Sequence, residues 1–166
     1  MKLPWIAPFL SVALFTACKE SPSTHAGTVR VGTYHPPSLV LAWYRSPDHA
    51  KDLDALVTAR DAALKAGDSV KVAECEKQGA ALQDLAHRQL AGEAGIEDIL
   101  ARLAGDMPAI AKEASVIRIA AEGDVLGDRV EFVDVTDRLV ERFHPDEATR
   151  KLLAEIREVP KGTGVH

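Results

Sequence analysis

Aromatic residues are scarce in this sequence, and Phe, Trp and Tyr together make up 5% of its 166 residues. Hydrophobic residues as a whole make up 46%, and Ala is the commonest of them. This composition argues against a large aromatic core and favours helices that pack on small side chains. The sequence also lacks a run of basic residues, and its net charge is -5. Because neutralisation of phosphates drives nucleic-acid binding, we expect no nucleic-acid partner.

Motifs of the common catalytic sites are absent as well. The six histidines form no His-x-x-x-His pair, and there is no Gly-x-Ser-x-Gly elbow and no phosphate-binding loop. Residues 122–128 contain two Gly-Asp pairs but lack the alternating oxygen ligands and the final Glu of a calcium-binding EF-hand. We therefore expect a plain hairpin loop at 122–128, no catalytic, cofactor-binding or metal-binding residues, and no enzymatic activity.

The first 17 residues have the features of a signal peptide. Lys2 supplies a positive charge at the start, and residues 3–15 carry no charge and are almost entirely apolar. This apolar stretch is too short to span a bilayer, which needs about 20 residues. We therefore predict that residues 1–17 are an export signal.

Cys18 is the predicted site of lipid attachment. It ends the segment 14–18, Leu-Phe-Thr-Ala-Cys, which resembles a bacterial lipobox. In such a box, small residues precede a cysteine that is diacylated, and a dedicated peptidase then cuts before it. Several acyl chains on one residue form a stable membrane anchor. The alternative is an ordinary secretory peptide cut after Ala26, because residues 24–26, Thr-His-Ala, satisfy the small-x-small rule.

Residues 18–27 connect the predicted lipid to the rest of the chain. Ser, Pro and Gly are frequent after the cysteine and apolar residues are almost absent, so this segment is predicted to be a flexible tether. Lys19 follows the cysteine. Where an Asp at this position directs a lipoprotein to the inner membrane, a Lys favours the outer membrane. The sequence thus predicts a lipid-anchored protein of the cell envelope that faces the periplasm.

Residues 28–160 form the predicted folded domain, with 161–166 as a short tail. β-Branched and other strand-forming residues are concentrated at 28–34, 116–120 and 129–133, which are therefore predicted to be strands. A sheet of three such short strands is open, and its edges need partners. We expect an α+β fold with a small three-stranded sheet as its body.

A projecting antiparallel helical hairpin is predicted at residues 48–90. Helix-forming residues fill 51–66, a Gly-Asp-Ser turn follows at 67–69, and the second helix ends near Leu90. The second helix carries small and apolar residues in alternating steps of three and four, at Val72, Cys75, Gly79, Leu82 and Ala86. That spacing is typical of a coiled-coil seam, so we expect the Cys75 thiol to be buried in it.

A break follows the hairpin. Two glycines within residues 91–95 disfavour a continuous helix, because each costs about 1 kcal/mol in a helix interior. Shorter helices are predicted beyond the break, at 96–103 and 108–114 and with starts near 134 and 145. His87 and Arg88 lie where the second helix of the hairpin approaches this break. We interpret them as residues that dock the arm on the body.

The pattern resembles the Skp/OmpH family of periplasmic chaperones at four places. They are the opening strand 29–34, the charged helical hairpin, the step from 110–114 into the strand 116–120, and the strand-to-helix ending Val-Asp-Val-Thr-Asp at 133–137. In that family the strands of three subunits build a common body. The hairpins project from it as arms around unfolded outer-membrane proteins.

The resemblance implies a homotrimer that binds other proteins through its arms, with unfolded outer-membrane proteins among the clients and no cofactor. Three features depart from the family: residues 48–66 span only about 28 Å as a helix, the chain is acidic, and it carries a lipid anchor. The alternative function is a structural spacer or adaptor with one envelope protein as partner. The arm outside the seam is Ala-rich and evenly charged, which favours neither function.

Replacing Cys18 by Ser is expected to abolish lipid labelling, because the thiol that accepts the diacylglyceryl group is lost. The measurement is incorporation of a labelled fatty acid in cells. Cys75→Ser is the matched control, since Cys75 is the other of the two cysteines, and it should leave the label in place. A mature protein whose first residue is Gly27 would contradict the lipid anchor.

Overall fold

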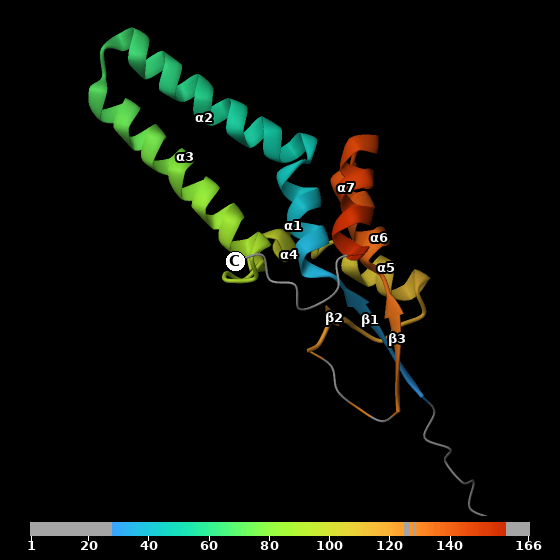
Figure 1. The fold of residues 1–166 in the computed structure, drawn as a ribbon. Coiled ribbons are helices and arrows are strands. Elements are labelled where there is room, and N and C mark those ends of the chain that lie inside the picture. Colours follow the sequence, from blue (N-terminus) through green and yellow to red (C-terminus); the bar gives the residue numbers. More distant parts are fainter. Residues whose placement is uncertain (1–27, 125–126, 128, 159–166) are drawn as a thin grey trace, which may run out of the picture.

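The computed structural model describes residues 28–124, 127 and 129–158 of the chain. The predicted leader, Cys18, the tether and the tail 161–166 lie outside these residues. The described part forms a small sheet, a central group of helices and a long helical hairpin (Figure 1). The elements are, in order, β1 (Val29–Tyr34), α1 (Pro36–Tyr44), α2 (Pro47–Ala66), α3 (Ser69–Leu90), α4 (Glu97–Leu103), α5 (Met107–Glu113), β2 (Ile119–Ala121), β3 (Val130–Asp134), α6 (Thr136–Val140), η1 (Glu141–Phe143) and α7 (Glu147–Glu158).

The sheet has three strands, with β1 in the middle and β2 and β3 on either side, both parallel to β1. The prediction of an α+β fold with a small three-stranded sheet is therefore confirmed. The prediction of a hairpin loop at 122–128 is wrong, because the strands of a hairpin pair with each other in antiparallel fashion. Here β2 and β3 are separated by β1 and run in the same direction. Gly and Asp residues between two short strands are compatible with either connection.

The second strand is shorter than predicted, because β2 begins at Ile119 whereas residues 116–120 were expected to be extended. The preceding chain still accompanies β1, since the Ile117 N–H donates to the Arg30 carbonyl at 3.0 Å. The strand-forming residues therefore begin where the chain first contacts β1, before the regular hydrogen bonding of β2 begins at Ile119.

The two faces of the sheet are covered unequally. One face packs on the helices. On this face Gly32 lets β2 and the chain before it approach β1 closely, because a Cβ at this position would lie 3.1 Å from Ile119 Cγ1 and 3.2 Å from Val116 Cγ2. Side chains alternate along a strand, so Val29 and Phe132 point to the opposite face. They are 41% and 51% exposed. Val31 lies on the same face between them but is 2% exposed, so this face is only partly open to solvent.

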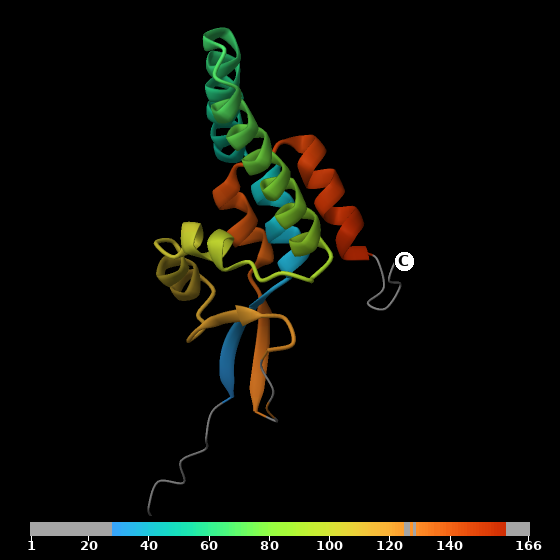
Figure 2. The ribbon, with the colours of Figure 1, turned by 90° about the vertical axis from the view of Figure 1, so that its left-hand side faces the viewer.

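Helix α1 lies at the centre of the core, enclosed by the base of the hairpin, α6 and α7 (Figure 2). Its side chains Leu39 and Val40 are fully buried and Trp43 is nearly so. A helix that is buried on several sides must be apolar around most of its circumference, which explains why residues 39–44 carry no charge. Buried side chains from the other helices complete the core, namely Ile99, Leu103, Ile110, Leu139, Phe143 and Leu153.

Helices α2 and α3 lie side by side and extend away from the sheet as a hairpin (Figure 1). Ser46 caps α2, because its hydroxyl accepts the N–H of His49 at 3.1 Å. Asp68 caps α3 through the N–H of Lys71 at 2.9 Å. Between them Gly67 ends α2 with a φ of 69°, in the left-handed region where glycine is favoured. These local signals explain why the turn forms where the sequence predicts it.

The predicted burial of Cys75 is confirmed, since this residue is 6% exposed on the side of α3 that faces α2. Gly79 lies one turn further along the same seam, and a Cβ built on it would lie 3.8 Å from a methyl group of Leu56. Small residues therefore allow the two helices to approach closely. None of the helices in the described part of the chain is long and apolar enough to cross a membrane.

Candidate functional site

An apolar groove runs along the hairpin between α2 and α3. Three adjoining hollows form it, with volumes of about 260, 340 and 430 Å³ from the tip to the base. The first two share Glu76, and the second and third share Leu53, Gly79 and Gln83. The groove is therefore continuous from the turn of the hairpin to the body.

The hairpin leaves most of its large apolar side chains exposed. Leu53, Val57 and Leu64 of α2 are 37%, 46% and 56% exposed. In the described structure, Ala63 and Cys75 are the only apolar residues of α2 and α3 that are buried. Two helices cover only a narrow strip of each other, so the apolar surface beside that strip is open to a further partner.

The hairpin joins the body through the side chain of Gln89, which is almost completely buried. Its amide nitrogen donates to the Gly95 carbonyl at 2.8 Å and to the Asp98 carboxylate at 2.7 Å. Its amide oxygen accepts the Tyr44 hydroxyl at 2.8 Å. Tyr44 belongs to α1 and Asp98 to α4, so one side chain of α3 connects the arm to two helices of the body.

The predicted docking residues, His87 and Arg88, are neighbours of Gln89 but have exposed side chains. Arg88 forms an ion pair with Asp84 of the same helix at 3.7 Å, and His87 lines the base of the groove. Their main-chain carbonyls accept N–H groups from the loop that follows, including that of Ala91. The docking role predicted for the two side chains stays a prediction.

Sequence reasoning missed Gln89, although a signal for it exists. The seam of α3 advances in steps of three and four and reaches Ala86, and the next step of three is Gln89. A glutamine on an otherwise apolar seam indicates a buried amide that needs hydrogen-bond partners. Those partners come from the loop and helix beyond the glycine break, which the seam alone does not reveal.

His49 packs against two aromatic rings of α1 at the base of the arm. Its ring centroid lies 5.4 Å from that of Trp43 and 4.8 Å from that of Tyr44. The Arg102 guanidinium lies 3.8 Å from the centre of the Trp43 ring. Burial lowers the pKa of His49, while the negative charge of Asp52 opposes this shift and the positive charge of Arg102 adds to it. A neutral imidazole therefore fits best among these rings. We call this contact region between arm and body, formed by Trp43, Tyr44, His49 and Gln89, the joint.

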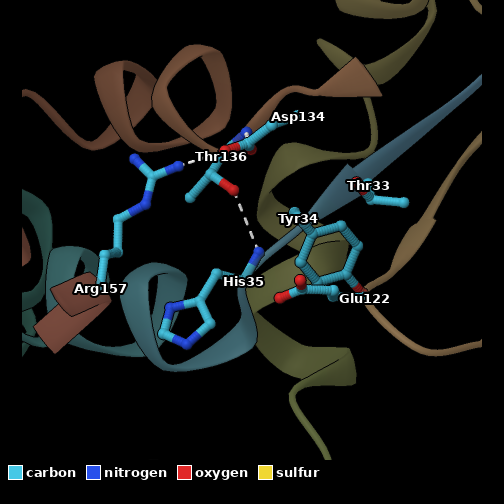
Figure 3. Close-up of a pocket in the computed structure, with 7 residues that line it drawn as sticks. All are labelled: Thr33, Tyr34, His35, Glu122, Asp134, Thr136 and Arg157. Carbon is cyan, nitrogen blue, oxygen red and sulfur yellow. Dashed lines mark hydrogen bonds and ion pairs between the residues drawn. The ribbon is translucent and has the colours of Figure 1, made fainter. Parts of the chain in front are cut away.

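A separate polar pocket of about 210 Å³ lies at the carboxyl ends of the strands (Figure 3). Its walls come from the end of β1, the residue after β2, the end of β3, α6 and α7. The lining residues are Thr33, Tyr34, His35, Glu122, Asp134, Thr136 and Arg157. They are far apart in the sequence, and only the parallel arrangement of the strands brings them together, so sequence reasoning did not assemble this group.

Thr136 holds the walls of this pocket together. It is 1% exposed, and its hydroxyl accepts the His35 N–H at 3.0 Å while its own N–H donates to the Asp134 carboxylate at 2.8 Å. Arg157 of α7 pairs with the same Asp134 carboxylate and with Asp137 at 2.6 Å (Figure 3 draws the first pair). The ends of β1, β3 and α7 are thereby joined in one network.

Comparisons with known proteins give no match for this chain, whether with protein-family models, with curated proteins or with solved structures. The groove, the joint and the polar pocket are therefore interpreted from their own geometry.

Replacing Gln89 by Leu is expected to lower the free energy of unfolding by about 2–4 kcal/mol, because the Tyr44 hydroxyl and the Gly95 carbonyl lose their buried partner. Urea unfolding followed by circular dichroism measures this change. Gln83→Leu is the matched control on the exposed part of the same helix, and it should change the free energy by less than about 0.5 kcal/mol. Equal effects of the two substitutions would show that Gln89 does not hold the joint.

Proposed function

We propose that this chain is a lipid-anchored protein of the bacterial cell envelope that binds other proteins through its helical hairpin. The observation that carries the proposal is the open apolar groove between α2 and α3, whose side chains the hairpin itself leaves uncovered. The resemblance of the sequence to the Skp/OmpH chaperones, in which paired helices serve as arms, supports the same conclusion.

The groove suits an apolar segment of another polypeptide. Contiguous exposed apolar surface on a folded protein commonly marks an interaction site, and grooves between helices accept apolar side chains of a bound segment. Helix α3 has 22 residues and is therefore about 33 Å long. About ten residues of extended chain cover that distance. A site of this size fits a local apolar segment of a client rather than a whole folded surface.

The proposed anchor at Cys18 suits this use of the hairpin. The amino end of β1 and the tip of the hairpin lie at opposite ends of the molecule (Figure 1). A lipid attached before β1 would therefore hold the hairpin away from the membrane surface. In that arrangement the groove is accessible to proteins that pass through the periplasm.

The proposal includes a homotrimer. Among the described residues, β2 and β3 are edge strands, each paired on one side only. Exposed apolar side chains lie on or beside these strands, with Ile117 73% and Phe132 51% exposed. Unpaired strand edges beside apolar side chains are features that association covers. Joining the sheets of three chains would cover them and would enclose a space between three hairpins.

A structural spacer or adaptor is the second candidate function. The buried hydrogen bonds of Gln89 and the aromatic packing of His49 hold the hairpin on the body at two places. A firmly held arm favours a fixed distance between two envelope components. A spacer binds one folded partner, whereas a chaperone of this kind must accept many unfolded clients.

Val57→Lys is expected to weaken client protection about tenfold, because it places a charge among apolar side chains of the groove. A denatured outer-membrane barrel protein is diluted from urea into the protein, and aggregation is followed by light scattering. Thr58→Lys adds the same charge to the neighbouring exposed residue outside the groove lining and should protect the client normally. Unchanged aggregation at a several-fold excess of the unaltered protein would favour the spacer.

Static light scattering on residues 28–166 is expected to give about three chain masses, because the sheet edges and their apolar neighbours are covered by association. Phe132→Glu places a charge on the exposed sheet face and should shift the mass toward that of one chain. A clean monomer of the unaltered residues 28–166 at micromolar concentration would contradict the trimer.

A further inference from the structure

Two attachments of different chemistry hold the hairpin on the body. Helix α3 is held by Gln89, whose side-chain amide does not titrate. Helix α2 is held by His49 in its first turn, whose ring makes T-shaped contacts with Trp43 and Tyr44 of α1. A histidine side chain changes its charge between about pH 5 and 8. One attachment can therefore respond to pH, whereas the other cannot.

His49 also lies beside the point where the chain turns from the body into the arm. Only Arg45 and Ser46 separate α1 from α2 (Figure 1). The Ser46 hydroxyl caps α2 by accepting the His49 N–H at 3.1 Å, and His49 is 8% exposed. A movement of His49 would therefore disturb the helix cap and the aromatic packing together.

The surroundings of His49 disfavour a positive charge. Burial is the largest cause that lowers its pKa; the negative charge of Asp52 opposes this shift and the positive charge of Arg102 adds to it. Asp52 is itself paired with Arg102 at 3.4 Å, and the same guanidinium lies 3.8 Å from the centre of the Trp43 ring. This carboxylate and this ring thus already face a cation. The first turn of a helix is also an unfavourable place for a cation, because the N-terminal end of the helix dipole is positive.

Two further titratable side chains face His49 from α3 and α1. His87 lines the same hollow at the base of the groove, so a positive charge on both rings would be repulsive. Burial and, to a smaller extent, the negative charge of Asp98 raise the pKa of Tyr44, so its hydroxyl stays neutral and supplies no counter-charge. A proton on His49 is therefore held poorly while the ring stays in place.

We propose that the joint is a pH-sensitive hinge, in which protonation of His49 on acidification releases the base of α2 from the body while Gln89 keeps α3 attached. The arm then changes from a fixed position to a pivoting one. Tyr44, His49 and His87 line the hollow of about 430 Å³ at the base of the groove, so the release also alters that hollow. An effect on bound clients rests on the proposed function, whereas the hinge itself does not.

The distance between arm and body, measured with a pair of spin labels, tests the proposal. The labels are placed on Lys65→Cys near the arm tip and on Glu155→Cys of α7, two exposed positions, in the full chain with Cys18→Ser and Cys75→Ala. A narrow distance distribution is expected at about pH 7.5 and a broad one at about pH 4.5. The ratio of pivoting to fixed arms should rise by at most about tenfold per pH unit, because one proton is taken up. A distribution that stays narrow over this whole range would overturn the proposal.

Substitution of His49 by Phe keeps an aromatic ring that cannot be protonated, so the distribution should stay narrow at low pH. His87→Gln removes the other histidine of the same hollow and should broaden as the unaltered joint does. Circular dichroism verifies that each variant is folded, and His49→Gln takes the place of His49→Phe where the latter is not. Equal broadening with and without His49 would overturn the proposal, because another group would then be the one that titrates.

The titration of the His49 ring, followed by NMR in the chain with its native joint, needs no substitution at this position. Its midpoint should lie below the ordinary value of 6.5 and coincide with the change in distance. The released ring takes up a proton near 6.5 and the docked ring only at lower pH, so acidification favours release from about pH 6.5 downward. A midpoint above 6.5 would overturn the proposal. Neither measurement uses a client, so failure of the hinge and failure of the groove are separable.

Discussion

The burial of helix α1 is the constraint on which the rest of this structure depends. Leu39 and Val40 are completely excluded from solvent, so a polar group at either position would be buried without a partner. The helix has nine residues and is about 14 Å long. His35 precedes it at the polar pocket, and Tyr44 ends it at the joint with the hairpin. One apolar helix therefore sets the distance between two polar assemblies of different chemistry.

Features that depend on local chemistry were predictable from the sequence. The hairpin has its own signals, because caps at Ser46 and Asp68 and a left-handed Gly67 define its start and its turn. The repeat of three and four residues on the second helix predicted the burial of Cys75, and the structure confirms it. Such signals work because each depends on residues a few positions apart, where the geometry of a helix is already known.

Features that depend on strand partners were not predictable in the same way. The strand residues around Ile119 and Phe132 mark extended chain, but they carry no information on which neighbour each strand chooses or in which direction it runs. The parallel order with β1 in the middle places His35, Glu122 and Thr136 at one edge of the sheet. The polar pocket is a consequence of that order, and it was therefore hidden until the topology was known.

The open groove and the buried joint belong to one physical arrangement. Helices in isolation are only marginally stable, and the hairpin buries few apolar side chains of its own beyond Ala63 and Cys75. Its order must then come from its caps and from the contacts of Gln89 and His49 at the base. A partner in the groove would bury the apolar surface that the hairpin leaves exposed, and binding to the folded state stabilises that state. Occupancy of the groove and stability of the arm are thus coupled, and the joint supplies the order that an unoccupied groove lacks.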